Sequence, residues 1–414
     1  MEKHDVVVVG GGVVGCTILH ELTKHGYRSI LCEKNPELVS EASSGNSGIT
    51  TTGYDVDEPI ELQLLQKARK LNEETYQKYN IPYRKSGAHL VAWTQDELDR
   101  LQSVIDKAHE VGVHDLYQLS KEKLRQREPH LSHDALGAVF IPGEMPVDSW
   151  LMPITLAHDA LLRGAKILRN CKITNGYRTS NDDWILMTTT GPIRTAVVIN
   201  CAGLYGDNVE NINQSSPFQI KPRKGQYVVF ERCADEVLNT AIFPFPTKIT
   251  RGVLLFPSVY GHIVAGPTAE EQDSRSDRST NPSTIDELTD YARKVLPALK
   301  HRKVIATYAG LRPGTNSKDY HIISNTERSW ITVGGIRSTG VSASLAIAQH
   351  VREELLNKFH LKPSNQEERS FDASRQRVKP SFRVLPSGHV EMNGYKYKIT
   401  HPLSRLGLLA KHKL

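Results

Sequence analysis

Three glycines near the start of the chain have the spacing of a phosphate-binding turn. An apolar run leads into Gly10, Gly12 and Gly15, which form a Gly-x-Gly-x-x-Gly pattern. In such a turn the first glycine allows an unusual backbone conformation, the second lets main-chain amides approach a pyrophosphate, and the third permits close packing of the next helix. That helix, expected at residues 13–25, would direct its positive end at the pyrophosphate. Glu33 lies 18 residues after the last glycine, where its carboxylate would accept a hydrogen bond from a ribose hydroxyl. These residues predict a dinucleotide site.

A second glycine turn near the end of the chain favours FAD as that dinucleotide. Residues 329–335 read as a strand that enters a glycine turn, and residues 341–357 as a helix with apolar side chains at helical spacing. The positive end of this helix would stabilise the negative charge that collects on a reduced flavin. An ordinary strand-turn-helix connection gives the same pattern. Enzymes that bind FAD through an N-terminal βαβ unit, however, commonly return to the flavin near the C-terminus, so we expect FAD rather than NAD.

The segments between these two turns predict two interleaved sheets. Strands are expected at residues 185–189 and 196–200, and the second leads into Ala202 and Gly203, small residues that let the backbone approach the cofactor again. Residues 226–267 are rich in strands separated by glycine and proline turns, which predicts a mostly antiparallel sheet beside the substrate. The predicted fold class is α/β, or mixed α+β: a Rossmann-type FAD-binding domain interleaved with a substrate domain built on antiparallel strands.

The order of these segments predicts discontinuous domains. We expect a FAD-binding domain formed by residues 1–80, 150–215 and 305–358. The expected substrate-binding domain is formed by residues 81–149 and 216–304. Residues 359–414 are expected to form a C-terminal extension with a β-hairpin about an Asn-Gly turn.

Composition indicates an ordinary globular chain. Of its 414 residues 39% are apolar and 24% are charged, and no segment reaches the ~20 consecutive apolar residues of a membrane span. The five cysteines form no Cys-x-x-Cys pair, so we expect no metal site and a reducing compartment. The cytoplasm is the expected location, with the peroxisome and the mitochondrion as alternatives, and no targeting segment is expected before the first strand. A net charge of +6 is too mild to indicate a nucleic-acid partner.

Six motifs along the chain occur in the order in which they occur in one known group of enzymes. They are residues 8–16, 43–49, 222–227, 266–269, 308–313 and 334–340. In these motifs the chain resembles FAD-dependent oxidoreductases of the D-amino-acid-oxidase/glycine-oxidase superfamily, in particular glycerol-3-phosphate oxidases and dehydrogenases and L-2-hydroxyglutarate dehydrogenases. The resemblance covers residues 4–355. It implies a p-hydroxybenzoate-hydroxylase-like fold, with the flavin between the Rossmann-type domain and the antiparallel sheet.

The resemblance also implies the chemistry and the residues that carry it. Members of the group oxidise a CH–OH or CH–NH carbon by hydride transfer to flavin N5, and an arginine holds the carboxylate or phosphate of the substrate. Arg312 stands at the position of that arginine, and its planar fork suits bidentate capture of either anion. Ser338 falls where the group places a polar residue over the flavin, a position that a helix N-cap would also explain.

The same motifs supply the expected cofactor contacts. No cysteine lies in the Arg312 turn, where some relatives tether their flavin, so a non-covalent FAD is expected. The residues expected to bind it are Gly10, Gly12, Val14, Gly15, Glu33, Lys34, Ser44, Asn46, Ser47, Ala202, Gly203, Gly310, Gly335, Ser338, Gly340 and Val341.

Thr51 departs from the pattern of the group. In glycerol-3-phosphate oxidases the corresponding position holds a histidine that serves as base. A threonine hydroxyl has no usable pKa near neutrality, so Thr51 cannot accept the proton as a histidine does. Either another group is the base or the substrate is a different one. His89, on a strand expected at residues 87–94, is the first alternative, followed by Tyr54 and Asp55.

Arg251 is a second departure. Oxidases of the subgroup carry here a lysine thought to assist oxygen at the flavin. Arginine keeps the positive charge but is bulkier and spreads it over a planar group. The change favours a dehydrogenase over an oxidase, unless Arg251 is a solvent-facing loop residue.

Three functions follow from these residues. The favoured one is a FAD-dependent dehydrogenase or oxidase acting on the CH–OH group of a small anionic substrate, glycerol 3-phosphate or a 2-hydroxy acid such as L-2-hydroxyglutarate. Its electrons would pass to a quinone, another carrier or oxygen. The second is an amine or amino-acid oxidase, because a neutral amine needs no strong base. The third is a non-catalytic flavin-binding protein that has lost the base.

Overall fold

The computed structural model describes residues 2–246, 252–364 and 381–410. The first of its two large sheets is centred on β1 (Lys3–Val9), which pairs in parallel with β2 and β11. Its strands run in the order β18-β19-β11-β1-β2-β8, and β9 and β10 extend the sheet from β11. The remaining strands of this sheet are β2 (Ser29–Cys32), β8 (Lys166–Leu168), β9 (Ile173–Arg178), β10 (Trp184–Thr188), β11 (Ile193–Asn200), β18 (His321–Asn325) and β19 (Trp330–Gly334).

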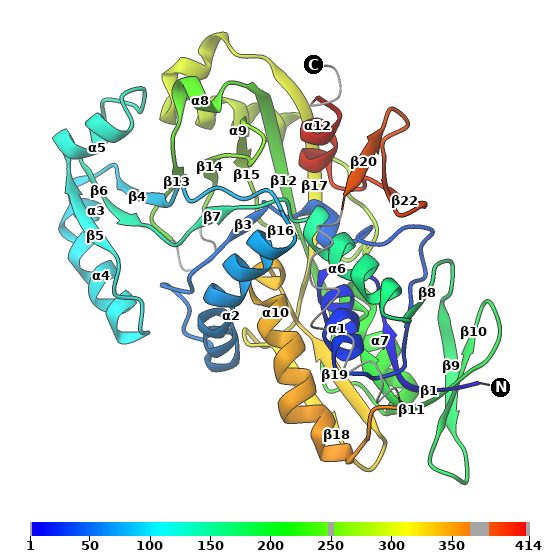
Figure 1. Cartoon of the computed structure of the whole chain (residues 1–414). Helices are drawn as coiled ribbons and strands as arrows, with labels where there is room; N and C mark the ends of the chain where they lie inside the picture. Colours follow the sequence, from blue (N-terminus) through cyan, green and yellow to red (C-terminus); the bar gives the residue numbers. More distant parts are fainter. Residues whose placement is uncertain (1, 247–251, 365–380, 411–414) are drawn as a thin grey trace.

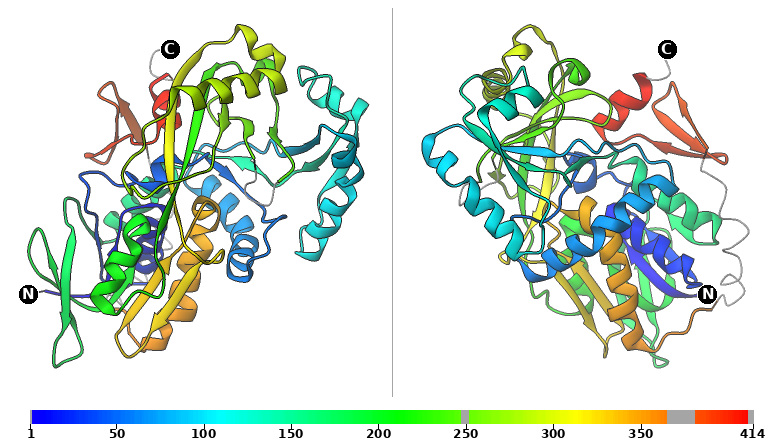
Figure 2. Two further views of the ribbon diagram at one scale, coloured as in Figure 1. Left: turned by 180° about the vertical axis from the view of Figure 1, so that it is seen from behind. Right: turned by 60° about the vertical axis from the view of Figure 1, so that its left-hand side comes forward.

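Both faces of β1 are buried, which explains its unbroken run of valines. Val6 and Val8 belong to one hydrophobic core, whereas Val7 and Val9 belong to another on the opposite face. Helices cover the first face, and α1 and α10 lie side by side on it (Figures 1 and 2). The helices of this face are α1 (Val13–Lys24), α2 (Pro59–Lys78), α6 (Leu151–Leu162) and α10 (Gly340–His350), and the other face is covered by α7 (Gly206–Asn213), which follows the short turn η2 (Gly203–Tyr205).

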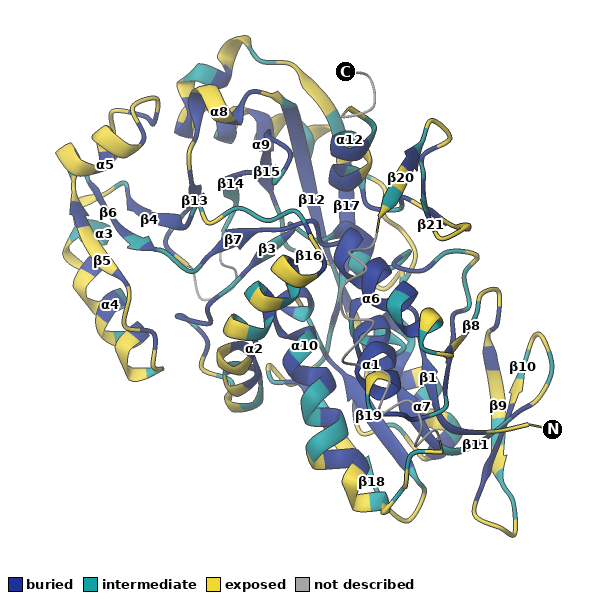
Figure 3. Ribbon diagram, in the orientation of Figure 1, coloured by how far each residue is buried: buried dark blue, intermediate teal, exposed yellow. Residues whose placement is uncertain are grey.

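The second sheet has nine strands and is antiparallel except where β13 pairs with β4. Its strands follow the order β16-β12-β15-β14-β13-β4-β6-β5, and β17 pairs with β12. In the long β12–β17 pair, β12 is buried along most of its length, whereas β17 is exposed or half-buried at its start and is buried mainly from Tyr308 onward (Figure 3). The members are β4 (Ala88–Ala92), β5 (Tyr117–Ser120), β6 (Gly137–Ile141), β12 (Lys221–Arg232), β13 (Ala241–Phe243), β14 (Leu254–Pro257), β15 (His262–Gly266), β16 (Glu270–Glu271) and β17 (Val304–Gly314).

Helices flank this second sheet, and α4 and α5 turn exposed faces to the outside (Figure 3). They are α3 (Gln95–Asp99), α4 (Leu101–Glu110), α5 (Lys121–Arg127), α8 (Ala234–Val237), α9 (Pro282–Val295) and the short turn η3 (Pro297–His301). The expected mixed α/β architecture, with parallel and antiparallel strands, is confirmed.

The strand β17 belongs to the antiparallel sheet, although the expected FAD-binding domain included residues from 305 onward. Its residues pair with β12 along ten positions, with Arg312 opposite Arg223, and the first sheet is rejoined only at β18. Strand pairing therefore assigns β17 to the antiparallel sheet. The division of the chain into domains otherwise stays a prediction.

A short two-stranded ladder brings two distant segments together. β3 (Ile49–Thr50) pairs antiparallel with β7 (Met145–Pro146), with Thr50 opposite Met145. Thr51 follows β3 and Glu144 precedes β7, so the next pair in this register sets Thr51 opposite Glu144. A small ladder therefore determines which side chain lies next to Thr51.

The C-terminal segment forms a small sheet and a helix. The hairpin expected about Asn393 and Gly394 is present and a third strand precedes it. In this segment lie β20 (Phe382–Leu385), β21 (His389–Met392), β22 (Tyr395–Lys398) and α12 (Pro402–Ala410), whereas η4 (Val351–Leu355) and η5 (Leu356–Phe359) continue α10. In the described ranges no helix has both the length and the apolar run that crossing a membrane takes.

Candidate functional site

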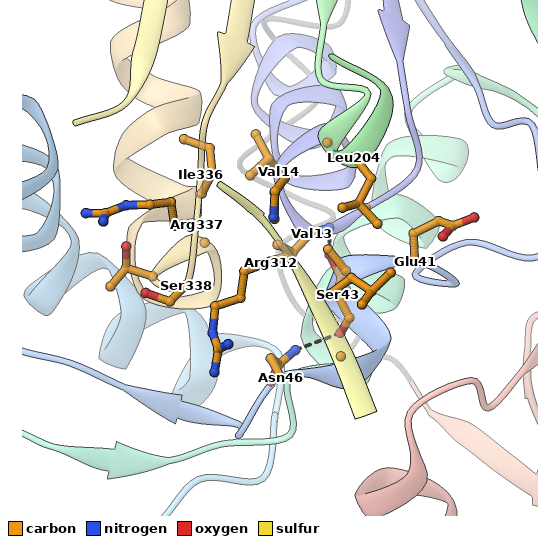
Figure 4. A pocket seen from close by; sticks show the side chains of 18 of the residues that line it. Val13, Val14, Glu41, Ser43, Asn46, Leu204, Arg312, Ile336, Arg337 and Ser338 are labelled. Atoms are coloured by element: carbon orange, nitrogen blue, oxygen red, sulfur yellow. Dashed lines mark hydrogen bonds between the residues drawn. The ribbon is translucent and has the colours of Figure 1, made fainter. Parts of the chain in front are cut away.

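A cavity of about 900 Å³ lies where the two sheets meet. It is lined by the turn between β1 and α1, the loop of residues 40–55, the end of β11, parts of β12 and β17, and the turn before α10. This volume is at the upper end of the range for small-molecule pockets, which suits a dinucleotide and a small substrate together. Figure 4 shows Arg312 entering the cavity from one side and Ser43 and Glu41 lining another part of it.

The glycine turn has the backbone features that its spacing predicts. Gly10 has φ of +108°, and a Cβ added there would lie 2.5 Å from the carbonyl oxygen of Cys201. Gly12 is the N-cap of α1 and lines the cavity. Gly15 lies outside the lining, because its role is packing: a Cβ there would lie 1.9 Å from the carbonyl oxygen of Gly10.

The N-terminus of α1 faces the cavity, and its first-turn amides have no acceptor within the helix. The first turn contains no acidic residue that would repel an anion. The Val13 amide donates to Ser43 Oγ at 3.0 Å, a contact that the sequence did not reveal. Ser44, the expected contact, is buried outside the lining and its hydroxyl donates to Glu41 O at 2.9 Å. Two adjacent serines point in different directions, so their motif alone could not distinguish them.

Glu33 and Lys34 both line the cavity. Glu33 Oε2 accepts from Gly11 N at 2.7 Å and Oε1 accepts from Asn35 N at 2.8 Å, so the main chain fixes the carboxylate. Burial raises the pKa of Glu33 against these hydrogen bonds. Lys34 Nζ donates to Glu41 Oε1 at 2.5 Å and lies 4.5 Å from the ring centre of Tyr205.

The loop around Asn46 is held from three directions. Asn46 Nδ2 donates to Ser43 O at 2.6 Å, while Asn46 O accepts from Tyr308 Oη at 3.2 Å and from His401 Nε2 at 3.1 Å. The C-terminal segment therefore contacts this loop of the cavity lining through His401. Ser47, Ala202 and Gly203 also line the cavity, as expected.

Gly310 and the turn before α10 form the opposite part of the lining. Gly310 packs against the loop before β3, since a Cβ there would lie 2.2 Å from Gly45 O. Thr339, and not Ser338, is the N-cap of α10, so the Ser338 side chain is available to the cavity. The remaining expected members of the lining are Val14, Gly335, Gly340 and Val341.

Thr51 lines the cavity together with Tyr54 and Asp55. The Thr51 hydroxyl donates to Glu144 Oε1 at 3.1 Å, and Glu144 also lines the cavity. Sequence reasoning did not single out Glu144, because a single glutamate before a short strand carries no motif.

His89 does not reach the cavity, so its expected role as base is wrong. Its strand neighbours Ala88 and Leu90 pack in the core that contains Tyr54 and Tyr227, whereas Val91 packs in the core on the other face. By strand alternation His89 shares the face of Val91. Its side chain is fully buried, its Nδ1 lies 2.7 Å from Thr240 Oγ1, and burial lowers its pKa to about 3. Arg251 lies outside the described residues.

The residues of the cavity fit FAD. A pyrophosphate requires a helix N-terminus without acidic side chains and with a glycine N-cap, and α1 has both. A ribose requires a carboxylate after the second strand, and the buried Glu33 provides it. No group of three or more histidine, cysteine, aspartate or glutamate side chains in the described part of the chain could hold a metal ion. All five cysteines are free and buried.

Comparisons with known proteins agree with this fit. The model of the family "FAD dependent oxidoreductase" matches residues 5–354. The chain is 30% identical to a glycerol 3-phosphate dehydrogenase of Caloramator mitchellensis over 85% of this chain and 74% of that protein. It is 26% identical to a mitochondrial L-2-hydroxyglutarate dehydrogenase of Caenorhabditis elegans, over 87% of this chain and 95% of that protein.

A solved structure is similar over nearly the same span. The L-alpha-glycerophosphate oxidase of Mycoplasma pneumoniae, solved with FAD bound, has a TM-score of 0.80 at 28% identity, and the match covers 86% of this chain and 95% of that one. Because the family match spans most of the sequence and the cavity suits the cofactor, the chain belongs to the FAD-dependent oxidoreductases, with FAD as its cofactor.

Proposed function

We propose that the protein oxidises the CH–OH group of a small anionic substrate, glycerol 3-phosphate or a 2-hydroxy acid such as L-2-hydroxyglutarate. FAD, when bound, takes up the hydride. The observation that carries the proposal is the Arg312 guanidinium in the cavity beside the expected flavin position.

Arg312 lines this cavity and forms no ion pair with a carboxylate of the described residues. Its guanidinium donates to Thr268 O at 3.1 Å and to Lys224 O at 3.5 Å, and among the described residues no carboxylate lies within ion-pair distance of it. A guanidinium has five N–H donors, so several remain for a ligand. Burial lowers the pKa of Arg312, and the charge of Arg223 on the neighbouring strand adds to this effect. An anionic ligand would offset both the cost of burying the Arg312 charge and its repulsion from Arg223.

The second cation near this position is Arg223, which also lines the cavity. Its Nε lies 3.1 Å from Glu271 Oε1, so its charge is partly met by the protein. Arg312 is therefore the better anchor for a phosphate or carboxylate. The names of the two relatives, glycerol 3-phosphate dehydrogenase and L-2-hydroxyglutarate dehydrogenase, each combine such an anion with a hydroxyl-bearing carbon.

The residues proposed to hold FAD without a covalent bond come from both ends of the chain. The start of α1 with Gly12 and Val14 would hold the pyrophosphate, and Glu33 the ribose. The start of α10, with Ser338 beside it, would stabilise negative charge on the flavin. Acid precipitation of the holoprotein should leave the flavin in solution.

An amine or amino-acid oxidase is the second candidate, because Thr51 occupies the position where alcohol oxidation calls for a base. Anaerobic titration separates the candidates. Glycerol 3-phosphate or L-2-hydroxyglutarate should bleach the flavin of the purified holoprotein. Bleaching by N-methyl amino acids alone would support the amine reaction, and no bleaching by any of these compounds would contradict the proposed function.

A further inference from the structure

Glu144 is a buried carboxyl group in contact with both Thr51 and the cavity. Only 1% of its surface is exposed, and it lies directly before β7. The pairing of β3 with β7 sets Thr50 opposite Met145 and so brings the residues on either side, Thr51 and Glu144, into contact. The position of this carboxyl group therefore follows from the strand register.

Three hydrogen bonds converge on one oxygen of Glu144. Its Oε1 accepts from Thr51 Oγ1 at 3.1 Å, from Thr52 N at 2.8 Å and from Thr52 Oγ1 at 2.9 Å. The Thr51 main chain is fixed as well, because its amide donates to Ser342 Oγ at 2.9 Å. Thr51 is partly exposed to the cavity, whereas Thr52 is fully buried. Thr51 is thus the hydroxyl that links Glu144 to a substrate in the cavity.

We propose that Glu144 accepts the hydroxyl proton of the substrate through Thr51 Oγ1. The proposal rests on the proposed CH–OH oxidation. It assigns the base to a carboxylate one hydrogen bond behind Thr51, and it gives Thr51 the role of a neutral relay.

The relay balances protons and electrons. When a CH–OH group becomes a carbonyl, its C–H hydrogen leaves with two electrons as a hydride, which bound FAD would accept, and its O–H proton must go to a base. That proton passes to Thr51 Oγ1 while the hydroxyl proton of Thr51 passes to Glu144 Oε1. Thr51 ends as it began, and Glu144 ends as a neutral acid.

The surroundings of Glu144 suit a proton acceptor. Burial raises the pKa of Glu144 to about 7, the negative charge of Asp55 acts in the same direction, and the threonine hydrogen bonds oppose it. Arg69 of α2 lies beside Gly143 and is bound to Asp115, and α10 contributes the neutral Ser342. Glu58 and Glu61 also line the cavity and lie near Arg337. A base is most effective when its pKa lies near the working pH.

Glu128 offers a matched control. Its Oε1 accepts from Thr240 N at 2.9 Å and from Thr240 Oγ1 at 2.8 Å, its Oε2 accepts from Asn239 N at 3.0 Å, and burial raises its pKa. Glu128 is 1% exposed but is not part of the cavity lining. It reproduces the burial and the hydrogen bonds of Glu144 without the contact to Thr51.

The test is the rate of anaerobic flavin reduction at saturating substrate, measured across pH in the holoprotein. We expect Glu144→Gln to lower this rate by about 10²–10⁴-fold, the usual effect of losing a positioned base. It should also abolish the rise in rate through pH ~7, with little change in substrate affinity. Thr51→Val should have a similar effect and Thr51→Ser a small one, whereas Glu128→Gln should keep the rate and its pH profile.

A spectroscopic reading is independent of turnover. Infrared difference spectra of the unmodified holoprotein between about pH 5 and about pH 9 should show a buried carboxyl group losing its proton, and Glu144→Gln should remove that band. An unchanged rate and pH profile in Glu144→Gln, or an effect on substrate affinity alone, would overturn the relay while the proposed function stands. If Glu144→Gln does not fold, an unchanged rate in Thr51→Val would overturn it in the same way. Failure of the unmodified protein to be reduced by any CH–OH substrate would overturn both.

Discussion

The two walls of the cavity are built in different ways. The cofactor wall, which is the part of the lining proposed to hold FAD, is made of main-chain turns where β1, β11 and β19 of the first sheet end, and it is rich in glycine. The substrate wall, which is the part proposed to contact the substrate, depends on the antiparallel pairing of β12 with β17 and of β3 with β7, and it contributes charged side chains. The cofactor wall is therefore determined within short segments of the sequence, whereas the substrate wall is determined by the register of strands that lie far apart in the sequence.

The difference separates cofactor binding from substrate chemistry. A turn such as that of Gly10 and Gly12 forms from consecutive residues, whereas Thr51 and Glu144 are 93 residues apart in sequence. We therefore expect a change on the substrate wall to alter the reaction while the cofactor remains bound. This is how one fold hosts several activities.

Removing the anion anchor should affect the substrate wall alone. If Arg312 binds the substrate anion, Arg312→Ala should weaken substrate binding by about 2–5 kcal/mol, because a desolvated charge pair is lost. Arg312→Lys should lose much of that, since a point charge cannot reproduce the planar fork. Substrate titrations of the anaerobic flavin spectrum measure both. Unchanged kinetics in Arg312→Ala, or loss of FAD from it, would break the separation of the two walls.

Glu144 should make stability depend on pH. Its pKa is raised in the folded protein to about 7, so the folded state holds this proton more tightly than the unfolded state does. This proton therefore adds up to about 3 kcal/mol to the free energy of unfolding at pH values below the unfolded pKa of about 4.5. The contribution is lost as pH rises from about 4.5 to the folded pKa of about 7. Denaturant unfolding should show this fall as a difference between the unmodified protein and Glu144→Gln. Parallel pH dependences in the two proteins would contradict it.

Blocking the cofactor wall should weaken the binding of FAD, in contrast to the Arg312 variants, which should weaken the binding of substrate. Gly12→Val adds side-chain atoms at the proposed pyrophosphate position, where a Cβ alone would already lie 3.1 Å from Ser43 Oγ. We expect FAD affinity to fall by about 1–3 kcal/mol, the usual cost of overpacking. Flavin fluorescence during dilution reports the affinity. Full FAD retention would argue against this turn as the pyrophosphate site.

The smallest expected effect distinguishes two neighbouring serines. Ser43→Ala removes the acceptor of the Val13 amide at the start of α1 and should weaken FAD binding by about 1 kcal/mol. Ser44→Ala is the control, because Ser44 bonds to Glu41 O outside the lining and should leave FAD affinity unchanged. A larger effect of Ser44→Ala would reverse our placement of the two side chains.

The sequence allowed the cofactor wall to be predicted because its information is local. The spacing of Gly10, Gly12 and Glu33 corresponds to one turn and one neighbouring strand, and the turn before α10 is similarly compact. Fold class followed from the alternation of segments and from the resemblance. These features need no knowledge of strand register.

The substrate wall could be predicted only in part. The motif of Arg312 predicted its place in the site, and it does line the cavity, but its role there stays a prediction. The pairing of β17 with β12 was not predicted, because neighbours in a sheet are not evident from one sequence. His89 was chosen on a correct strand, but which face of that strand meets the cavity depends on packing. Glu144 carries no motif, and only the β3–β7 register reveals its contact with Thr51.

The proposed CH–OH oxidation is tested most directly by following the hydrogen on the carbon that bears the hydroxyl. Glycerol 3-phosphate and L-2-hydroxyglutarate can be prepared with deuterium on the carbon that bears the hydroxyl, and the rate of anaerobic flavin reduction compared with that of the unlabelled compounds. We predict that at least one compound reduces the flavin and that deuterium slows the reaction, because the C–H bond breaks as hydride leaves. Reduction by N-methyl amino acids with no reduction by either hydroxy compound would contradict the account.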